Sequence, residues 1–152
     1  LYEVIFNSYR QNYSEQPYKY STLMPGVMET LEFFYENKIL MGICTNKRQF
    51  VTEKLIEQMS LKNFFTTVVG ARDNIPLKPE PNMLLLAMEE FKTTNKSFYM
   101  VGDTSNDIDA AKAANIKSIV VKGGYTDKNV YKLGATHTLR NMRDLITLLG
   151  LS

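Results

Sequence analysis

The fold is decided by residues 98–114, which read FYMVGDTSNDIDAAKAA. The run Phe98–Val101 is apolar or aromatic throughout, as expected for a strand of a parallel sheet whose two faces are both covered. A short polar loop follows, and residues 109–114 are then dense in alanine, which suits a helix lying close against a sheet. The order strand, loop, helix predicts one unit of a doubly wound α/β fold.

Apolar runs of the same kind recur along the chain and alternate with helical patterns. Strands are predicted at residues 39–44, 66–70, 98–101 and 116–121, with a weaker edge strand at 136–139. Besides residues 109–114, helix faces are predicted by four apolar stripes: Val27, Leu31 and Phe34; Val51, Leu55 and Met59; Leu84, Ala87, Met88 and Phe91; and Met142, Leu145, Ile146 and Leu149. This alternation predicts parallel strands joined by right-handed helical crossovers.

Composition excludes several classes of protein. The 152 residues are 44% hydrophobic, which fits one globular domain, and 18 Lys and Arg against 16 Asp and Glu give no basic excess for nucleic acid. No apolar run approaches the roughly 20 residues of a membrane span. The single cysteine, Cys44, excludes an intrachain disulfide framework and favours a reducing compartment, so we expect a cytoplasmic protein without nucleic-acid or membrane partners.

The predicted strand 39–44 ends in Thr45-Asn46-Lys47. Ligands of open α/β sheets bind outside the carboxyl ends of the strands. A hydroxyl and exposed N–H groups at such an end could bind an anion. Alternatively, Thr45 or Asn46 caps the following helix, and for this segment alone capping is favoured.

The segment Lys78-Pro79-Glu80-Pro81 follows the second predicted strand. Its two prolines stiffen the backbone around Lys78 and delay the next helix to about Glu80. A rigidly mounted lysine could neutralise charge on a phosphoryl group. The alternative, an exposed lysine in a loop, is favoured for this segment alone.

Two carboxylates four residues apart, Asp103 and Asp107, bracket the loop after the third predicted strand. Mg²⁺ prefers oxygen ligands and often uses one or two protein carboxylates, with water and phosphate completing the octahedron. Gly102 would let metal and phosphate approach the backbone closely. Helix capping by Asp103 or Ser105 explains one acid but not both, so a functional interpretation is favoured here.

Together these segments resemble the motifs of the haloacid dehalogenase superfamily, and within it the phosphoglycolate phosphatases. The resemblance covers residues 24–148. Thr45 corresponds to the second motif of the superfamily, Lys78 to the third, and Asp103 with Asp107 to the fourth. Haloacid dehalogenases proper and β-phosphoglucomutases usually carry different residues at the fourth motif, so the aspartate pair favours a metal-dependent phosphatase.

The resemblance implies Mg²⁺-dependent hydrolysis of a small phosphorylated metabolite, similar to phosphoglycolate, through an aspartyl-phosphate. Thr45, Lys78 and Asp103 would be catalytic residues. Thr45, the Asn46 backbone and Lys78 would hold the phosphate. Asp103 would bind Mg²⁺ directly, while Asp107 would act through a water or orient Lys78.

One motif of the superfamily is absent from residues 1–152: the Asp-x-Asp-Gly-Thr that ends the first strand and supplies the nucleophile. Residues 1–22 resemble the end of a helical cap and its hinge, with Leu1, Ile5 and Tyr9 as one helix face. Residues 23–152 would then be an α/β core lacking its central strand. Because the cap carries specificity in this superfamily, the substrate stays open.

The missing strand leads to a structural prediction. Its absence would leave residues 39–44 and 98–101 about 10 Å apart with unpaired backbone groups, which are costly to bury. We therefore expect either a strand from outside residues 1–152, such as a preceding segment or another molecule, to fill the gap or the two strands to pair directly.

Two alternatives to an enzyme remain. A truncated or degraded phosphatase could bind a phosphorylated ligand or partner without catalysis. A response-regulator domain also combines aspartates, threonine and lysine around Mg²⁺. There, however, the acids come first along the chain, and here Thr45 and Lys78 precede Asp103.

Overall fold

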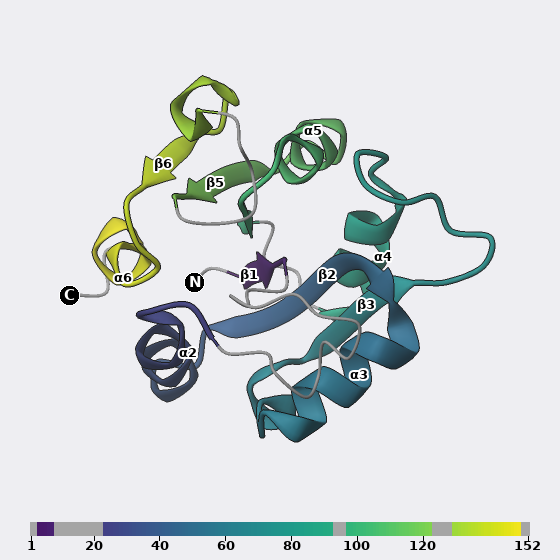
Figure 1. Ribbon diagram of the computed structural model, residues 1–152, viewed down its shortest axis with the longest axis horizontal. Coiled ribbons are helices and arrows are strands. Elements are labelled where there is room, and N and C mark those ends of the chain that lie inside the picture. Colours follow the sequence, from purple (N-terminus) through teal and green to yellow (C-terminus); the bar gives the residue numbers. More distant parts are fainter. Residues whose placement is uncertain (1–2, 8–22, 93–96, 123–128, 150–152) are drawn as a thin grey trace.

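The computed structural model describes residues 3–7, 23–92, 97–122 and 129–149, and its strands form one parallel sheet of order β3-β2-β1-β4-β5-β6 (Figure 1). The strands are β1 (Glu3–Phe6), β2 (Leu40–Arg48), β3 (Thr67–Ala71), β4 (Phe98–Gly102), β5 (Lys117–Val121) and β6 (His137–Leu139). The α-helices are α2 (Val27–Glu36), α3 (Gln49–Gln58), α4 (Asn82–Glu90), α5 (Ser105–Ala113) and α6 (Asp144–Leu148), with 3-10 turns η1 (Lys62–Phe64) and η2 (Val130–Lys132). The doubly wound α/β fold and all five predicted strands are therefore confirmed.

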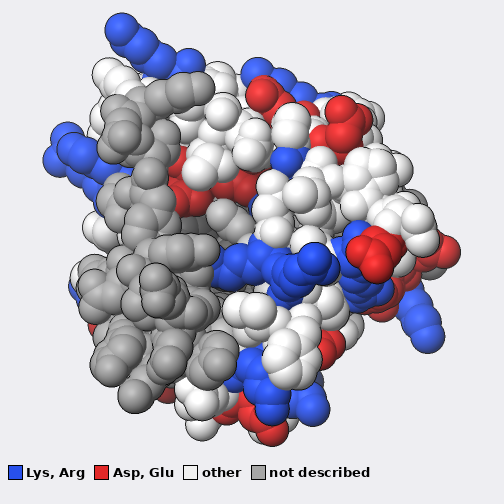
Figure 2. Space-filling view, turned by 45° about the vertical axis from the view of Figure 1, so that its right-hand side comes forward, with Lys and Arg blue, Asp and Glu red and all other residues white. Residues whose placement is uncertain are grey.

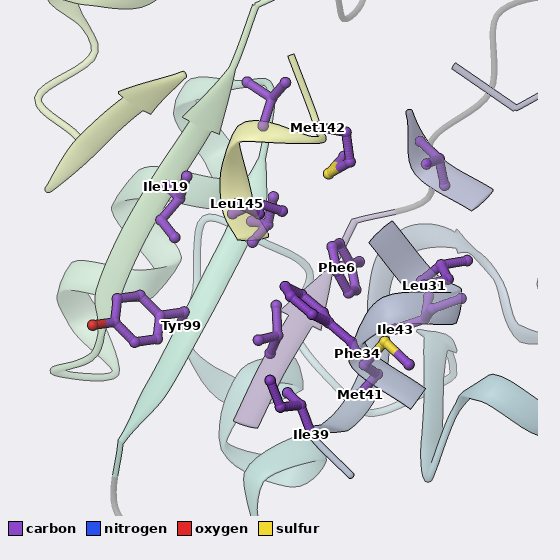
Figure 3. Close-up of a cluster of buried hydrophobic side chains, with 14 of the residues drawn as sticks. Phe6, Leu31, Phe34, Ile39, Met41, Ile43, Tyr99, Ile119, Met142 and Leu145 are labelled. Carbon is purple, nitrogen blue, oxygen red and sulfur yellow. The ribbon is translucent and has the colours of Figure 1, made fainter. Parts of the chain in front are cut away.

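Helices cover both faces of the sheet, which explains why its strands are apolar without polar alternation. On one face, side chains from the sheet meet α2 and α6, with Phe6 directed toward Phe34 and Met142 close by (Figure 3). On the other face, Ile5 packs in a second cluster with residues of α4 and α5. Successive residues of β1 thus enter opposite cores, as the two-residue period of a strand requires.

The N-terminal segment corrects the sequence analysis. Residues Glu3–Phe6 were expected to belong to a cap helix and hinge, but they form the central strand β1. This strand pairs in parallel with β2 on one side and β4 on the other, so that Ile5 lies opposite Gly42 and Met100. The expectation of a core without its central strand, filled from outside or closed by direct pairing, was therefore wrong.

The error has a physical cause. The spacing of Leu1, Ile5 and Tyr9 matches a helix face, but the consecutive apolar residues Val4, Ile5 and Phe6 also suit a short strand buried on both faces. Periodicity cannot separate these for so short a run. The backbone groups of β2 and β4 need partners, and the chain's own N-terminus supplies them. The remainder of the predicted cap, residues 8–22, lies outside the described residues.

In the described part of the chain, none of the helices combines the length and apolarity that a bilayer crossing requires.

Candidate functional site

Three neighbouring strands, β2, β1 and β4, present polar side chains at their carboxyl ends. Asn7 follows β1, Thr45 lies within the carboxyl-terminal half of β2, and Asp103 follows β4. Lys78 reaches the same edge from the loop before α4. All the sequence-predicted site residues therefore lie at one edge of the sheet, as the topological rule for open sheets requires.

The Lys78 ammonium is the centre of the site. Lys78 is only 3% exposed, so the alternative of an exposed loop lysine, favoured for that segment alone, was wrong. Its Nζ donates to Asp107 Oδ1 at 2.6 Å, to the Cys44 carbonyl at 2.8 Å and to Asn7 Oδ1 at 3.3 Å. Three acceptors match the three N–H groups of an ammonium, so its position is fixed by groups from three segments of the chain.

Asp107 is occupied by protein donors at both carboxylate oxygens. Oδ1 accepts the Lys78 ammonium, while Oδ2 accepts the N–H groups of Asp103 and Thr104 at 3.1 and 3.2 Å and the Thr104 hydroxyl at 3.1 Å. Thr104 is the N-cap of α5, and Asp107, the third residue of that helix, completes a capping box with it. The alternative of capping by Asp103 or Ser105 therefore named the wrong residues. A Cβ at residue 102 would collide with the Asp107 carboxylate, so glycine there makes room for Asp107.

Asp103 lies beside Asn7, which also contacts Lys78 and Asp107. Asn7 Nδ2 donates to Asp103 Oδ1 at 3.2 Å and lies 3.4 Å from Asp107 Oδ2. One amide therefore contacts both carboxylates through its nitrogen and the lysine through its oxygen. The sequence analysis missed Asn7, although a signal was present: it is the polar residue directly after the apolar run Val4–Phe6.

Thr45 and Asn46 do not cap α3. Strand β2 continues to Arg48, and Arg48 is the N-cap residue of α3, so the capping alternative was wrong. Thr45 is buried at the site, where its hydroxyl accepts the Lys47 N–H at 3.2 Å. The Asn46 side chain is turned to the backbone of Lys78, with both hydrogen bonds at 2.9 Å.

Cys44 contributes its backbone carbonyl to the site, as an acceptor for the Lys78 ammonium, and not its thiol. Burial raises the pKa of the Cys44 thiol to about 11, although the nearby Lys78 ammonium opposes this effect. The thiolate is the reactive form of cysteine, so a thiol with this pKa is a poor nucleophile at neutral pH. Cys44 is a free, buried cysteine within β2.

The site combines the Lys78 ammonium with the carboxylates of Asp103 and Asp107, so binding of an anion there would be favoured by an additional cation. On the face seen in Figure 2, Lys and Arg side chains form a band beside a hollow in which acidic side chains are visible. Among the described residues, no three His, Cys, Asp or Glu side chains gather in a group that could hold a metal ion. A cation at this site would therefore depend on few protein carboxylates.

Comparison with known proteins assigns the chain to a family. Residues 2–121 match the haloacid dehalogenase-like hydrolase family. The chain is 32% identical over 148 residues to a phosphoglycolate phosphatase of Salmonella typhi, covering 97% of this chain and 58% of that relative. It is 39% identical over 114 residues to a phosphoglycolate phosphatase of Photobacterium profundum, covering 74% of this chain and 49% of that protein.

A solved structure shows the same fold. The crystal structure of a "predicted phosphoglycolate phosphatase" from Haemophilus somnus superposes with a TM-score of 0.79 at 23% identity, covering 86% of this chain and 58% of that one. The chain thus spans 49% to 58% of the length of these relatives.

Proposed function

Because the chain belongs to the haloacid dehalogenase-like hydrolase family, we propose that the whole protein hydrolyses a small phosphomonoester in a Mg²⁺-dependent reaction. The observation that carries this proposal is the buried Lys78 ammonium, held beside Asp103 and Asp107 at the carboxyl edge of the sheet. The phosphoglycolate phosphatases among its relatives support a substrate similar to phosphoglycolate. We place the reaction in the cytoplasm, which the single buried cysteine supports.

The roles of the residues follow from charge and hydrogen bonding. Thr45, through its hydroxyl, and Asn46, through its backbone N–H, would hold the oxygens of the phosphoryl group. Lys78 would neutralise negative charge at the reacting centre, where preorganised groups are worth far more than in water. Asp107 would hold the Lys78 ammonium in place, a role that its 2.6 Å contact supports.

The donor set fits Mg²⁺, with Asp103 as its protein ligand. Both oxygens of Asp107 accept hydrogen bonds from protein groups, so Asp107 would not contact the ion directly. One carboxylate suffices for an ion that takes its other ligands from water and phosphate. When bound, Mg²⁺ would offset the negative charge of the phosphate ester.

The proposed hydrolysis through an aspartyl-phosphate requires a carboxylate nucleophile. An aspartyl-phosphate requires a carboxylate at the end of the central strand, and Asn7 follows that strand here. A carboxamide does not form an acyl phosphate as a carboxylate does. Asn7 stands at the position where this route needs its nucleophile, so we do not expect residues 1–152 by themselves to form an aspartyl-phosphate.

Asn7 also favours a second candidate function, which is binding of a phosphorylated ligand without hydrolysis. The amide keeps the contacts to Lys78 and Asp103 but adds no negative charge. The two candidates differ in one measurement. The whole protein should bind inorganic phosphate without Mg²⁺-dependent turnover if it acts only as a binding module, and with such turnover if it is a hydrolase.

We expect Lys78→Met to lower turnover of a small phosphomonoester by the whole protein by about a hundredfold or more, the scale of losing one electrostatic stabiliser. Steady-state rates with phosphoglycolate and a panel of other phosphomonoesters measure this effect. Circular dichroism at the assay temperature verifies that the variant is folded. A folded variant with turnover within a few-fold of the wild-type rate would contradict the role of Lys78.

We expect Asp103→Asn to weaken Mg²⁺ binding, because the proposed site depends on one charged ligand. Titration calorimetry of both proteins with MgCl₂ measures the affinity. Asp109→Asn is a matched control, because Asp109 lies on the exposed side of α5. Equal affinities of wild type and Asp103→Asn would remove Asp103 from the metal site.

A further inference from the structure

The Asn46 side chain pairs with the backbone of Lys78 in both directions. Asn46 Nδ2 donates to the Lys78 carbonyl at 2.9 Å, and the Lys78 N–H donates to Asn46 Oδ1 at 2.9 Å. The two residues are 32 positions apart in the chain. Only a side-chain amide combines one donor and one acceptor in the spacing of a peptide group, so this contact depends on asparagine chemistry.

The same lysine is held at its other end by the site itself. Its Nζ contacts Asp107, the Cys44 carbonyl and Asn7 within 3.3 Å. The aliphatic stem of Lys78 is thus fixed at both ends, by Asn46 at the backbone and by three acceptors at the ammonium. A displacement of the backbone would change all three ammonium distances together.

We infer that Asn46 is a positioning residue, whose side chain sets the place of the Lys78 ammonium relative to the phosphoryl group. This inference rests on the proposed phosphate site and assigns the Asn46 side chain a role that is separate from its backbone N–H. Electrostatic stabilisation depends steeply on placement, since a displacement of about 1 Å can cost a hundredfold in rate. Among the described residues, this pair of hydrogen bonds links the Asn46 side chain to the loop that carries Lys78.

Three substitutions separate the parts of this contact. Asn46→Asp keeps the size and the acceptor but loses the donor, and it places a carboxylate oxygen against the Lys78 carbonyl. Asn46→Ala removes both groups. Asn46→Gln keeps both groups on a longer stem. Asn37→Asp is a matched control, because Asn37 also donates to a backbone carbonyl, that of Phe33 at 2.8 Å, but at an exposed helix end.

Calorimetric titration with inorganic phosphate, in buffer containing MgCl₂, tests the inference. We expect Asn46→Asp and Asn46→Ala to weaken phosphate binding about tenfold or more, Asn46→Gln to weaken it less than Asn46→Ala, and Asn37→Asp to leave it within twofold. Unchanged affinity in folded Asn46→Ala overturns the inference. So does equal weakening by Asn46→Gln and Asn46→Ala, which would leave the amide without a specific role.

A second background shows whether Asn46 acts through Lys78. In Lys78→Met/Asp107→Asn, which removes both charges of the buried pair, adding Asn46→Ala should change phosphate affinity by less than twofold. A further tenfold loss there would mean that Asn46 acts on phosphate independently of Lys78, which overturns the inference. If Lys78→Met alone binds phosphate as wild type does, the proposed function fails. If Lys78→Met weakens binding and Asn46→Ala does not, only the inference fails.

Discussion

Lys78→Met is expected to lower the free energy of unfolding by about 3–5 kcal/mol, because it leaves a buried carboxylate without its cation. Lys78 and Asp107 form an ion pair at 2.6 Å, and their side chains are 2% and 1% exposed. Methionine matches the length of the lysine stem, so lost packing contributes little. Urea unfolding followed by circular dichroism measures the loss. The comparison requires that wild type and variant unfold with the same m-value.

The chain contains a matched control for this experiment. Arg143 and Glu29 form an ion pair at 2.7 Å whose side chains are 61% and 60% exposed. Arg143→Met should cost no more than about 1 kcal/mol, since exposed pairs are weak and screened. The double variant Lys78→Met/Asp107→Asn should lose about 1–3 kcal/mol less than the sum of the single losses. Additive losses would contradict a coupled, buried pair.

Ile5→Ala is expected to lower the free energy of unfolding by about 2–5 kcal/mol, the range for truncating a large buried aliphatic side chain. Ile5 is fully buried in the central strand, between Gly42 on β2 and Met100 on β4. The loss combines the transfer of its side chain to water with a cavity that the flanking strands cannot close. Urea unfolding under the same conditions measures it.

Ile5→Ala also distinguishes the position of residues 3–6 in the central strand β1 from the position in a cap hinge that the sequence analysis predicted. In a cap hinge, Ile5 would be largely exposed and its truncation would cost about 0.5 kcal/mol or less. Leu85→Ala, at a site on α4 that is 47% exposed, provides the corresponding reference. A loss for Ile5→Ala no larger than that for Leu85→Ala would contradict the position of β1 in the sheet.

The strands and helices beyond residue 22 were predictable because their signals are local. β4 and β5 are apolar throughout, and their two-sided burial follows from helices on both faces of the sheet. α2 and α4 carry apolar residues at helical spacing and bury them against the sheet. These patterns depend only on neighbours within a few positions, so no long-range information was needed.

The candidate site was predictable to the extent that it follows from topology. Parallel strands place their carboxyl ends at one edge, which brings Thr45 and Asp103 together and made Lys78 a reasonable third member. The same reasoning could not distinguish the two aspartates. In the structure, Asp107 binds the Lys78 ammonium and accepts the Thr104 N–H at the N-terminus of α5. Glycine at residue 102 leaves room for its carboxylate.

By itself, the sequence determined the alternation of strands and helices and the strand ends at which the polar side chains gather. Only the tertiary structure decided that residues 3–6 form the central strand, since a short apolar run is compatible with a helix or a strand until β2 and β4 need a partner. It also decided the contacts of Asn7 and Asn46. Their partners lie 96 and 32 positions away, at Asp103 and Lys78. Contacts across such distances depend on how the elements pack, and no local pattern of residues encodes them.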